Sequence, residues 1–97
     1  MLLGLDLGTT SCKAAVVTFA GDEVAHGQAP LHWTAVATGA EIDPAVFVDC
    51  ALAAAREALA GAPEGRIAGV GVSSMAETGV LLDRRGEPVT AAIAWHD

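Results

Sequence analysis

Residues 2–19 read LLGLDLGTTSCKAAVVTF, and this stretch decides the fold. Its first part, Leu2 to Leu7, is a short apolar run that ends at Gly8, which is typical of a buried strand. Its last part, Lys13 to Phe19, is a second apolar run of strand length. The Gly-Thr-Thr-Ser between them is rich in turn-forming residues, so the two runs are predicted to form a β-hairpin.

The next segments predict an edge strand, a loop and a helix. Residues 20–22 (AGD) form a turn, and Glu23 to Ala29 is a weaker, more polar strand, as suits the edge of a sheet. Periodicity is lost from Pro30 to Ile42, which predicts a loop. A helix begins at Asp43-Pro44, because aspartate caps free N–H groups and proline suits the first helical position, and it ends at Gly61. Its predicted buried stripe consists of Val48, Leu52, Ala55 and Leu59.

Beyond the helix, Ile67 to Val72 is a fourth strand that is apolar on both faces and is therefore expected to be buried on both. A strand, a helix and a fully apolar strand indicate a crossover between parallel strands. Val80 to Leu82 and Ala91 to Trp95 predict two further short strands, with a turn at residues 83–88. The order of elements predicts an α/β fold with a mixed sheet, namely a partial ribonuclease-H-like domain of the actin-type ATPases.

The composition is that of a globular chain and restricts its partners. Of 97 residues, 53% are hydrophobic and 18% are charged, which suits one small domain. The net charge is −7 and the basic pair Arg84-Arg85 lies in a predicted turn, so nucleic acid is not an expected partner. No run approaches the length of a membrane span and the N-terminus lacks a basic lead, so we expect a cytoplasmic protein without a membrane partner. Cys12 and Cys50 have no motif spacing and are interpreted as reduced packing thiols.

The turn after the first strand has the composition of a phosphate-binding loop. Gly8 lets the backbone turn tightly, and Thr9, Thr10 and Ser11 place hydroxyl and N–H groups around one concavity. A carboxylate beside such a concavity, here Asp6, can hold Mg²⁺, usually through water. The turn is not a Walker loop, because GxxxxGK[ST] is absent. The same residues also suit an ordinary hairpin turn, so the turn alone leaves both interpretations open.

Several segments, taken in order, resemble the N-terminal part of the FGGY carbohydrate kinases, the family of the glycerol, xylulose and gluconate kinases. Residues 3–14 (LGLDLGTTSCKA) resemble the family's opening segment. Residues 41–44 (EIDP) resemble the Glu-x-Asp-Pro at the start of its first long helix. The other matching segments are residues 67–74 (IAGVGVSS), 79–83 (GVLLD), 86–88 (GEP) and 93–97 (IAWHD). The resemblance covers essentially the whole chain.

The resemblance implies an ATP-dependent kinase that phosphorylates a hydroxyl group of a sugar, ketose or polyol. It implies that Asp6 is the carboxylate associated with Mg²⁺ and that Gly8, Thr9 and Thr10 belong to the loop that binds the phosphates of ATP. In the family, a catalytic aspartate lies well downstream, and nothing in this chain corresponds to it.

The resemblance also implies a substrate site. Its expected residues are Met75, Ala76, Glu77, Trp95 and Asp97. Without the resemblance, Glu77 would be interpreted as an exposed loop residue, Trp95 as a core residue and Met75 as a filler of irregular space. Ala76 stands where glycerol kinases have arginine, and the Gln-Met-His of many xylulose kinases is absent, so another sugar, ketose or polyol is expected.

Residues 1–97 are therefore expected to be the N-terminal portion of the first lobe of an FGGY kinase, a fragment that lacks the second lobe and has no kinase activity alone. Apolar surface that the rest of the lobe should cover predicts self-association or a homodimer. Two alternatives stay open. One is another ATPase of the actin-like superfold, and the other is a non-catalytic, standalone α/β module.

Overall fold

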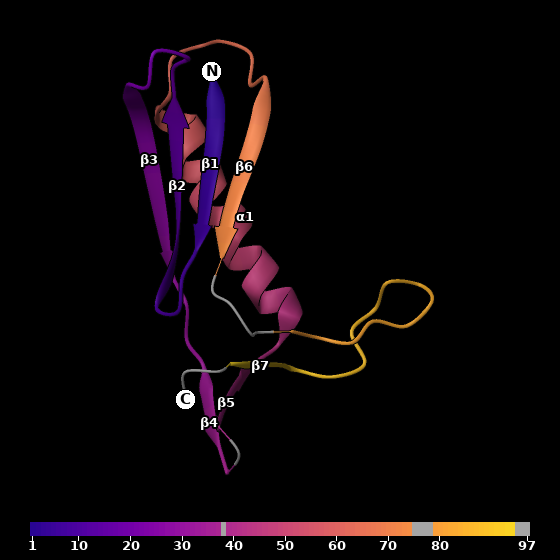
Figure 1. Cartoon of the computed structure of the whole chain (residues 1–97). Helices are drawn as coiled ribbons and strands as arrows, with labels where there is room; N and C mark the ends of the chain where they lie inside the picture. Colours follow the sequence, from indigo (N-terminus) through magenta and orange to yellow (C-terminus); the bar gives the residue numbers. More distant parts are fainter. Residues whose placement is uncertain (38, 75–78, 95–97) are drawn as a thin grey trace.

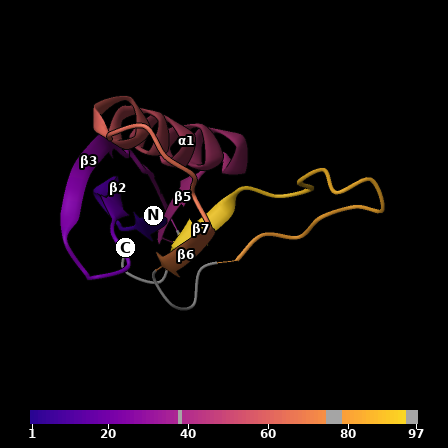
Figure 2. The ribbon, with the colours of Figure 1, turned by 90° about the horizontal axis from the view of Figure 1, so that it is seen from above.

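The computed structural model describes residues 1–37, 39–74 and 79–94. A four-stranded sheet with the order β3-β2-β1-β6 carries helix α1 on one face (Figures 1 and 2). A smaller sheet with the order β4-β5-β7 lies beyond one end of it (Figure 1). The elements are β1 (Leu2–Leu7), β2 (Ser11–Val17), β3 (Glu23–Pro30), β4 (Thr34–Val36), β5 (Gly39–Ile42), α1 (Pro44–Gly61), β6 (Gly69–Ser74) and β7 (Ala92–Ala94).

The predicted hairpin is confirmed, with β1 and β2 antiparallel from Leu2 opposite Val17 to Leu7 opposite Cys12. β2 begins two residues earlier than expected, because Ser11 and Cys12 already pair with β3. The turn is therefore shorter than the sequence suggested. β3 is the predicted edge strand, and the preceding turn closes with a bond from the amide of Thr18 to the carbonyl of Asp22.

The predicted crossover is also confirmed, since β6 runs parallel to β1 and α1 lies between them in the chain. The strand begins at Gly69 rather than Ile67. The expected burial of both of its faces is wrong, because the side chains of Val70 and Val72 are 58% and 62% exposed. The reason is that β6 is the edge of the sheet, and α1 packs mainly over β2 and β3.

The start of α1 is as predicted, but its buried face is not. The side chain of Asp43 accepts a hydrogen bond from the amide of Ala45, and Pro44 follows as the first helical residue. The buried helix residues are Cys50, Ala51, Ala54, Ala55 and Ala58, whereas Val48, Leu52 and Leu59 of the predicted stripe are exposed. The alanines face the sheet because the backbone of α1 lies directly against Gly27 of β3, which leaves no room for large side chains.

The segment predicted as a loop, Pro30 to Ile42, instead contains β4 and β5. They pair antiparallel, and β5 also pairs with β7. β7 confirms the predicted strand near Ala91 to Trp95 for its described part, although its partner is β5. Among the described residues, Val80 to Leu82 does not form a strand, and an isolated bridge joins Leu82 to Pro88.

The turn at residues 83–88 is confirmed. The carboxylate of Asp83 accepts hydrogen bonds from the amides of Arg85 and Glu87, at 2.8 and 3.0 Å. Gly86 has a φ of 80°, a left-handed conformation that favours glycine. These local bonds turn the chain between Leu82 and Pro88, which are joined by an isolated bridge.

Cys12 and Cys50 are free and buried, which confirms that they pack in the core between β2 and α1. Burial, followed by a hydrogen bond and charge interaction with Cys50 and then the charge of Asp6, raises the pKa of the Cys12 thiol to about 12. The thiol therefore stays protonated near neutral pH. Within the described residues, no helix has the length and apolar character needed to cross a membrane.

Replacing Asp43 with alanine is expected to destabilise the fold by about 1 kcal/mol, because the first turn of α1 loses its side-chain acceptor. Thermal denaturation followed by circular dichroism measures the change. Asp43→Asn keeps an oxygen acceptor and should retain most of the stability, whereas Asp49→Ala, an exposed substitution in the same helix, is the neutral control. Equal losses for Asp43→Ala and Asp49→Ala would show that the cap has no special role.

Candidate functional site

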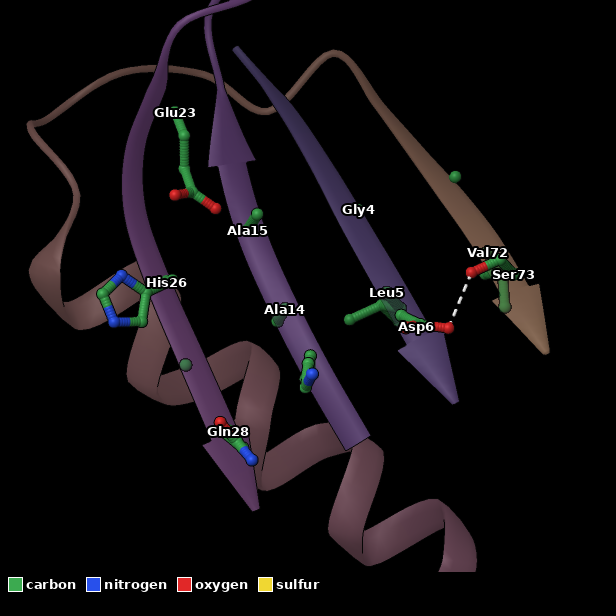
Figure 3. A pocket seen from close by; sticks show the side chains of 13 residues that line it. Gly4, Leu5, Asp6, Ala14, Ala15, Glu23, His26, Gln28, Val72 and Ser73 are labelled. Atoms are coloured by element: carbon green, nitrogen blue, oxygen red, sulfur yellow. Dashed lines mark hydrogen bonds between the residues drawn. The ribbon is translucent and has the colours of Figure 1, made fainter. Parts of the chain in front are cut away.

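Asp6 lies near the end of β1 on the face of the sheet that α1 leaves open. Gly27 faces the backbone of α1, and side chains alternate along a strand, so Asp6 and Lys13, which pair across β1 and β2, point to the opposite face. The hydroxyl of Ser73 on β6 donates a hydrogen bond of 2.9 Å to Oδ1 of Asp6 (Figure 3). Asp6 is therefore exposed to solvent but held in a defined orientation.

The turn between β1 and β2 is fixed by hydrogen bonds to its carbonyl groups. The amide of Gly8 donates to the carbonyl of Ser11 at 3.0 Å, and a Cβ atom on Gly8 would lie 2.9 Å from that oxygen. The carbonyl of Thr10 accepts from the amide of Leu31, and that of Thr9 accepts from the indole of Trp33, both at 2.9 Å. Glycine is thus required at position 8, because the carbonyl oxygen of Ser11 leaves no room for a Cβ atom.

The amide groups of the turn differ from its carbonyl groups in their hydrogen bonding. Within the described part of the chain, the amide N–H groups of Thr9 and Thr10 donate to no backbone carbonyl. The Ser11 side chain is buried, and its hydroxyl accepts a 3.3 Å bond from Gln28, so it is already engaged. Backbone N–H groups that have no carbonyl partner in a turn are the kind of group that binds anions in proteins.

The open face of the sheet forms a hollow of about 780 Å³ that leads toward Asp6 (Figure 3). Its floor contains Gly4, Ala15 and Gly71, whose small size leaves the space. Its polar lining residues are Asp6, Lys13, Glu23, His26, Gln28 and Ser73. The predicted metal residue thus lies in a solvent-accessible hollow.

The predicted substrate residues Met75, Ala76, Glu77, Trp95 and Asp97 lie outside the described residues. β6 carries the chain to Ser74, which is in register with Leu7. The segment that continues from Ser74 therefore starts beside the end of β1, one residue before the turn begins at Gly8. This register places Ser74, the last described residue before the first predicted substrate segment, beside the end of β1.

Sequence reasoning missed Ser73 and Trp33 as neighbours of the site. Ser73 is 67 residues from Asp6, and Trp33 is 24 residues from Thr9, so no local pattern connects them. For Ser73 the available signal was its position at the polar end of an apolar strand. Trp33 lies in the segment from Pro30 to Ile42, which the lack of periodicity predicts to be a loop.

A mixed sheet with three antiparallel strands, a crossover helix and a parallel strand, and with a carboxylate and a tight turn at the end of β1, defines part of a ribonuclease-H-like, actin-type ATPase domain. The chain also matches the model of the N-terminal domain of the FGGY family of carbohydrate kinases over residues 1–97. It therefore belongs to the FGGY family of carbohydrate kinases.

Two curated relatives and two solved structures support this membership. The chain is 42% identical to a xylulose kinase of Streptomyces coelicolor over all of its length and 20% of the relative's. It is 40% identical to a glycerol kinase of Leptothrix cholodnii, over 99% of this chain and 20% of the relative. The structure of a xylulose kinase from Rhodospirillum rubrum superposes with a TM-score of 0.86 at 36% identity, covering 95% of this chain and 20% of that one. The structure of a gluconate kinase from Lactobacillus acidophilus superposes with a TM-score of 0.85 at 26% identity, covering 97% of this chain and 19% of that one. The chain spans about a fifth of the length of these relatives.

Proposed function

We propose that this chain supplies one wall of the cleft of an ATP-dependent kinase that phosphorylates a hydroxyl group of a sugar, ketose or polyol. Residues 1–97 are the N-terminal portion of its first lobe. The observation that supports the proposal is the turn after β1. Within the described residues the amides of Thr9 and Thr10 donate no backbone hydrogen bond, and the turn follows an oriented carboxylate, Asp6. Family membership supplies the reaction class.

The residues present fit ATP and Mg²⁺. Backbone N–H groups in a tight turn suit phosphate oxygens. A single exposed carboxylate suits Mg²⁺, which keeps much of its water and shares phosphate ligands. When bound, Mg²⁺·ATP supplies the transferable phosphoryl group. Asp6 then orients the ion, and Gly8, Thr9, Thr10 and Ser11 form the loop against the phosphates. The structure supports contacts from Thr9 and Thr10 through their backbone, and supports a shaping role for Ser11.

The sugar side of the proposed cleft comprises Met75, Ala76, Glu77, Trp95 and Asp97. Glu77 accepts hydrogen bonds from substrate hydroxyls, and Trp95 packs against the carbon chain. The register of Ser74 with Leu7 supports this arrangement, because Ser74, which precedes the proposed substrate segment, lies beside the end of β1 that leads into the phosphate turn. Phosphoryl transfer depends mainly on positioning and charge stabilisation, so neighbouring half-sites are what the reaction needs.

The proposed cleft is incomplete in this chain. The catalytic base and the second lobe belong to the downstream part of an FGGY kinase, and closure of both lobes excludes water from the reaction. Residues 1–97 alone are therefore expected to lack kinase activity. Location in the cytoplasm, where ATP is supplied to metabolic enzymes, is part of the proposal, as is the absence of nucleic acid and membrane partners.

The proposal is tested by expressing the full open reading frame that contains this chain and screening sugars, ketoses and polyols for substrate-dependent release of ADP. One or a few of these compounds should stimulate ADP release strongly, and residues 1–97 expressed alone should release none. ADP release that no added compound stimulates would instead favour an actin-like ATPase of another kind. Failure to release ADP under any condition would favour a non-catalytic module.

Residues 1–97 expressed alone are expected to self-associate, because large apolar side chains remain uncovered. Val48 and Leu52 on α1 are 55% and 43% exposed, and Val70 and Val72 on β6 are 58% and 62% exposed. Burial of such surface gains about 25 cal/mol per Å². Light scattering should show dimers or larger species at high concentration. The double variant Leu52→Lys with Val72→Lys should shift them toward monomer, and a monodisperse wild-type monomer would contradict the prediction.

A further inference from the structure

Trp33 joins the loop before β4 to the proposed phosphate turn. Its indole Nε1–H donates a 2.9 Å hydrogen bond to the carbonyl oxygen of Thr9, 24 residues away in the chain. The indole is half-buried and packs against the core. The bond therefore links the turn to a side chain that is itself held in place.

Phe47 also packs against the indole. The two rings meet edge to face, with centroids 6.1 Å apart and planes at 78°, which is a favourable aromatic geometry. Phe47 lies in the first turn of α1, and its amide donates to the carbonyl of Asp43 at 3.2 Å. The position of the indole is thus set by the start of the helix, a rigid element of the fold.

Because a peptide unit is planar, the hydrogen bond from Trp33 also fixes the direction of the Thr10 amide. The carbonyl of Thr9 and the N–H of Thr10 belong to one trans peptide unit, so they point in opposite directions. Holding the Thr9 carbonyl toward Trp33 therefore directs the Thr10 N–H away from it. Leu31, which is buried, holds the next carbonyl along, that of Thr10, through a 2.9 Å bond from its amide. The hydrogen bonds from Trp33 and Leu31 together fix the two carbonyl groups of the turn.

We propose that Trp33 is a positioning residue for nucleotide binding: its indole N–H fixes the Thr9–Thr10 peptide so that the Thr10 amide donates to a phosphate of ATP. The inference rests on the proposed kinase function and adds to it a residue from outside the turn. Trp33 does not contact the nucleotide. It acts through the peptide that does.

Trp33→Phe in the full open reading frame tests this, because phenylalanine keeps an aromatic ring against Phe47 and removes the N–H donor. With ATP as the varied substrate, KM for ATP should rise about fivefold, the effect of one neutral hydrogen bond. KM for the sugar should stay within about twofold, as expected when only the phosphate side changes. In a protein labelled with ¹⁵N-threonine, the amide resonances of Thr9 and Thr10 should shift, and that of the distant Thr18 should not.

Two further variants keep the result decisive. Trp33 replaced by 3-benzothienylalanine retains the bicyclic shape and loses only the donor, so it should reproduce the Trp33→Phe result even if phenylalanine packs poorly. His32→Ala, an exposed change in the next residue, should leave both KM values unchanged. An unchanged KM for ATP in the benzothienyl protein would overturn this inference, and so would amide resonances of Thr9 and Thr10 that do not shift. If the wild-type protein is an active kinase, either result leaves the proposed function in place. An inactive wild-type protein would overturn the proposed function and this inference with it.

Discussion

Replacing Asp6 with asparagine is expected to lower kcat for the proposed phosphoryl transfer by on the order of a thousandfold in the protein encoded by the full open reading frame, the scale of losing one preorganised electrostatic contact. Asparagine has nearly the same shape, and its side-chain oxygen can still accept the bond from Ser73. What it lacks is the negative charge with which the Asp6 carboxylate is proposed to hold Mg²⁺, directly or through water. The measurement is kcat at saturating ATP, sugar and Mg²⁺.

Two controls separate the loss of the proposed metal ligand from a loss of fold. Asp22→Asn removes the same charge from an exposed turn at the other end of β2, and should leave kcat within about twofold. Asp6→Asn itself should melt within a few degrees of the wild type, because Asp6 is exposed. An Asp6→Asn protein that retains a tenth or more of the wild-type kcat would remove Asp6 from the proposed site.

Replacing Gly27 with alanine is expected to cost about 3 kcal/mol or more, the upper range for overpacking a core. A Cβ atom at this position would lie 2.8 Å from both the amide nitrogen of Ala58 and the Cβ of Glu57, and closer still to the carbonyl oxygen of Ala54. Two of these three atoms are backbone, so no side chain can rotate to relieve the contact. α1 must move away from β3, and the core then loses packing along the whole helix.

Gly71→Ala is the matched control, because it adds the same methyl group to a strand glycine. No atom lies within 4 Å of a Cβ built there. Thermal or urea denaturation of both variants measures the difference, and Gly71→Ala should stay within about 0.5 kcal/mol of the wild type. If the two variants unfold at the same midpoint, the close approach of α1 to β3 would be wrong.

The same glycine explains why the buried face of the helix could not be predicted from periodicity. The sequence pattern assigns the largest apolar residues to the core, and on that basis Val48, Leu52 and Leu59 were expected to be buried. Gly27 draws the helix backbone so close that only alanine and cysteine fit beneath it. This contact joins residues that are far apart in the chain, so a helical pattern alone contains no sign of it.

The hairpin and crossover were predictable because their signals are strong and local. β1 and β2 are apolar runs joined by turn residues, and Asp43-Pro44 marks the start of α1 clearly. β4 and β5 have three and four residues, with too little alternation to be recognised as strands. They form because each pairs with a neighbour, and β5 acquires a second partner from β7, about fifty residues further along the chain.

The proposed site was predictable to a similar extent. Asp6 and the turn after it are contiguous, and the family resemblance predicts a role for them. Ser73 and Trp33 reach them through contacts made only by the folded chain. The structure thus adds the residues that orient the predicted ones, and the roles of the residues predicted to contact phosphate, metal and sugar stay predictions.

The most direct test of the account is to locate the metal–triphosphate complex in the protein encoded by the full open reading frame. Mn²⁺·ATP, a paramagnetic substitute for Mg²⁺·ATP, is added to protein labelled with ¹⁵N-threonine, and the intensity of each amide signal is followed. The amides of Thr9 and Thr10 should lose their signals at the lowest concentrations, while that of Thr18, at the far end of β2, should persist. Thr9 and Thr10 signals that outlast the Thr18 signal would contradict the account, because the triphosphate would then bind elsewhere.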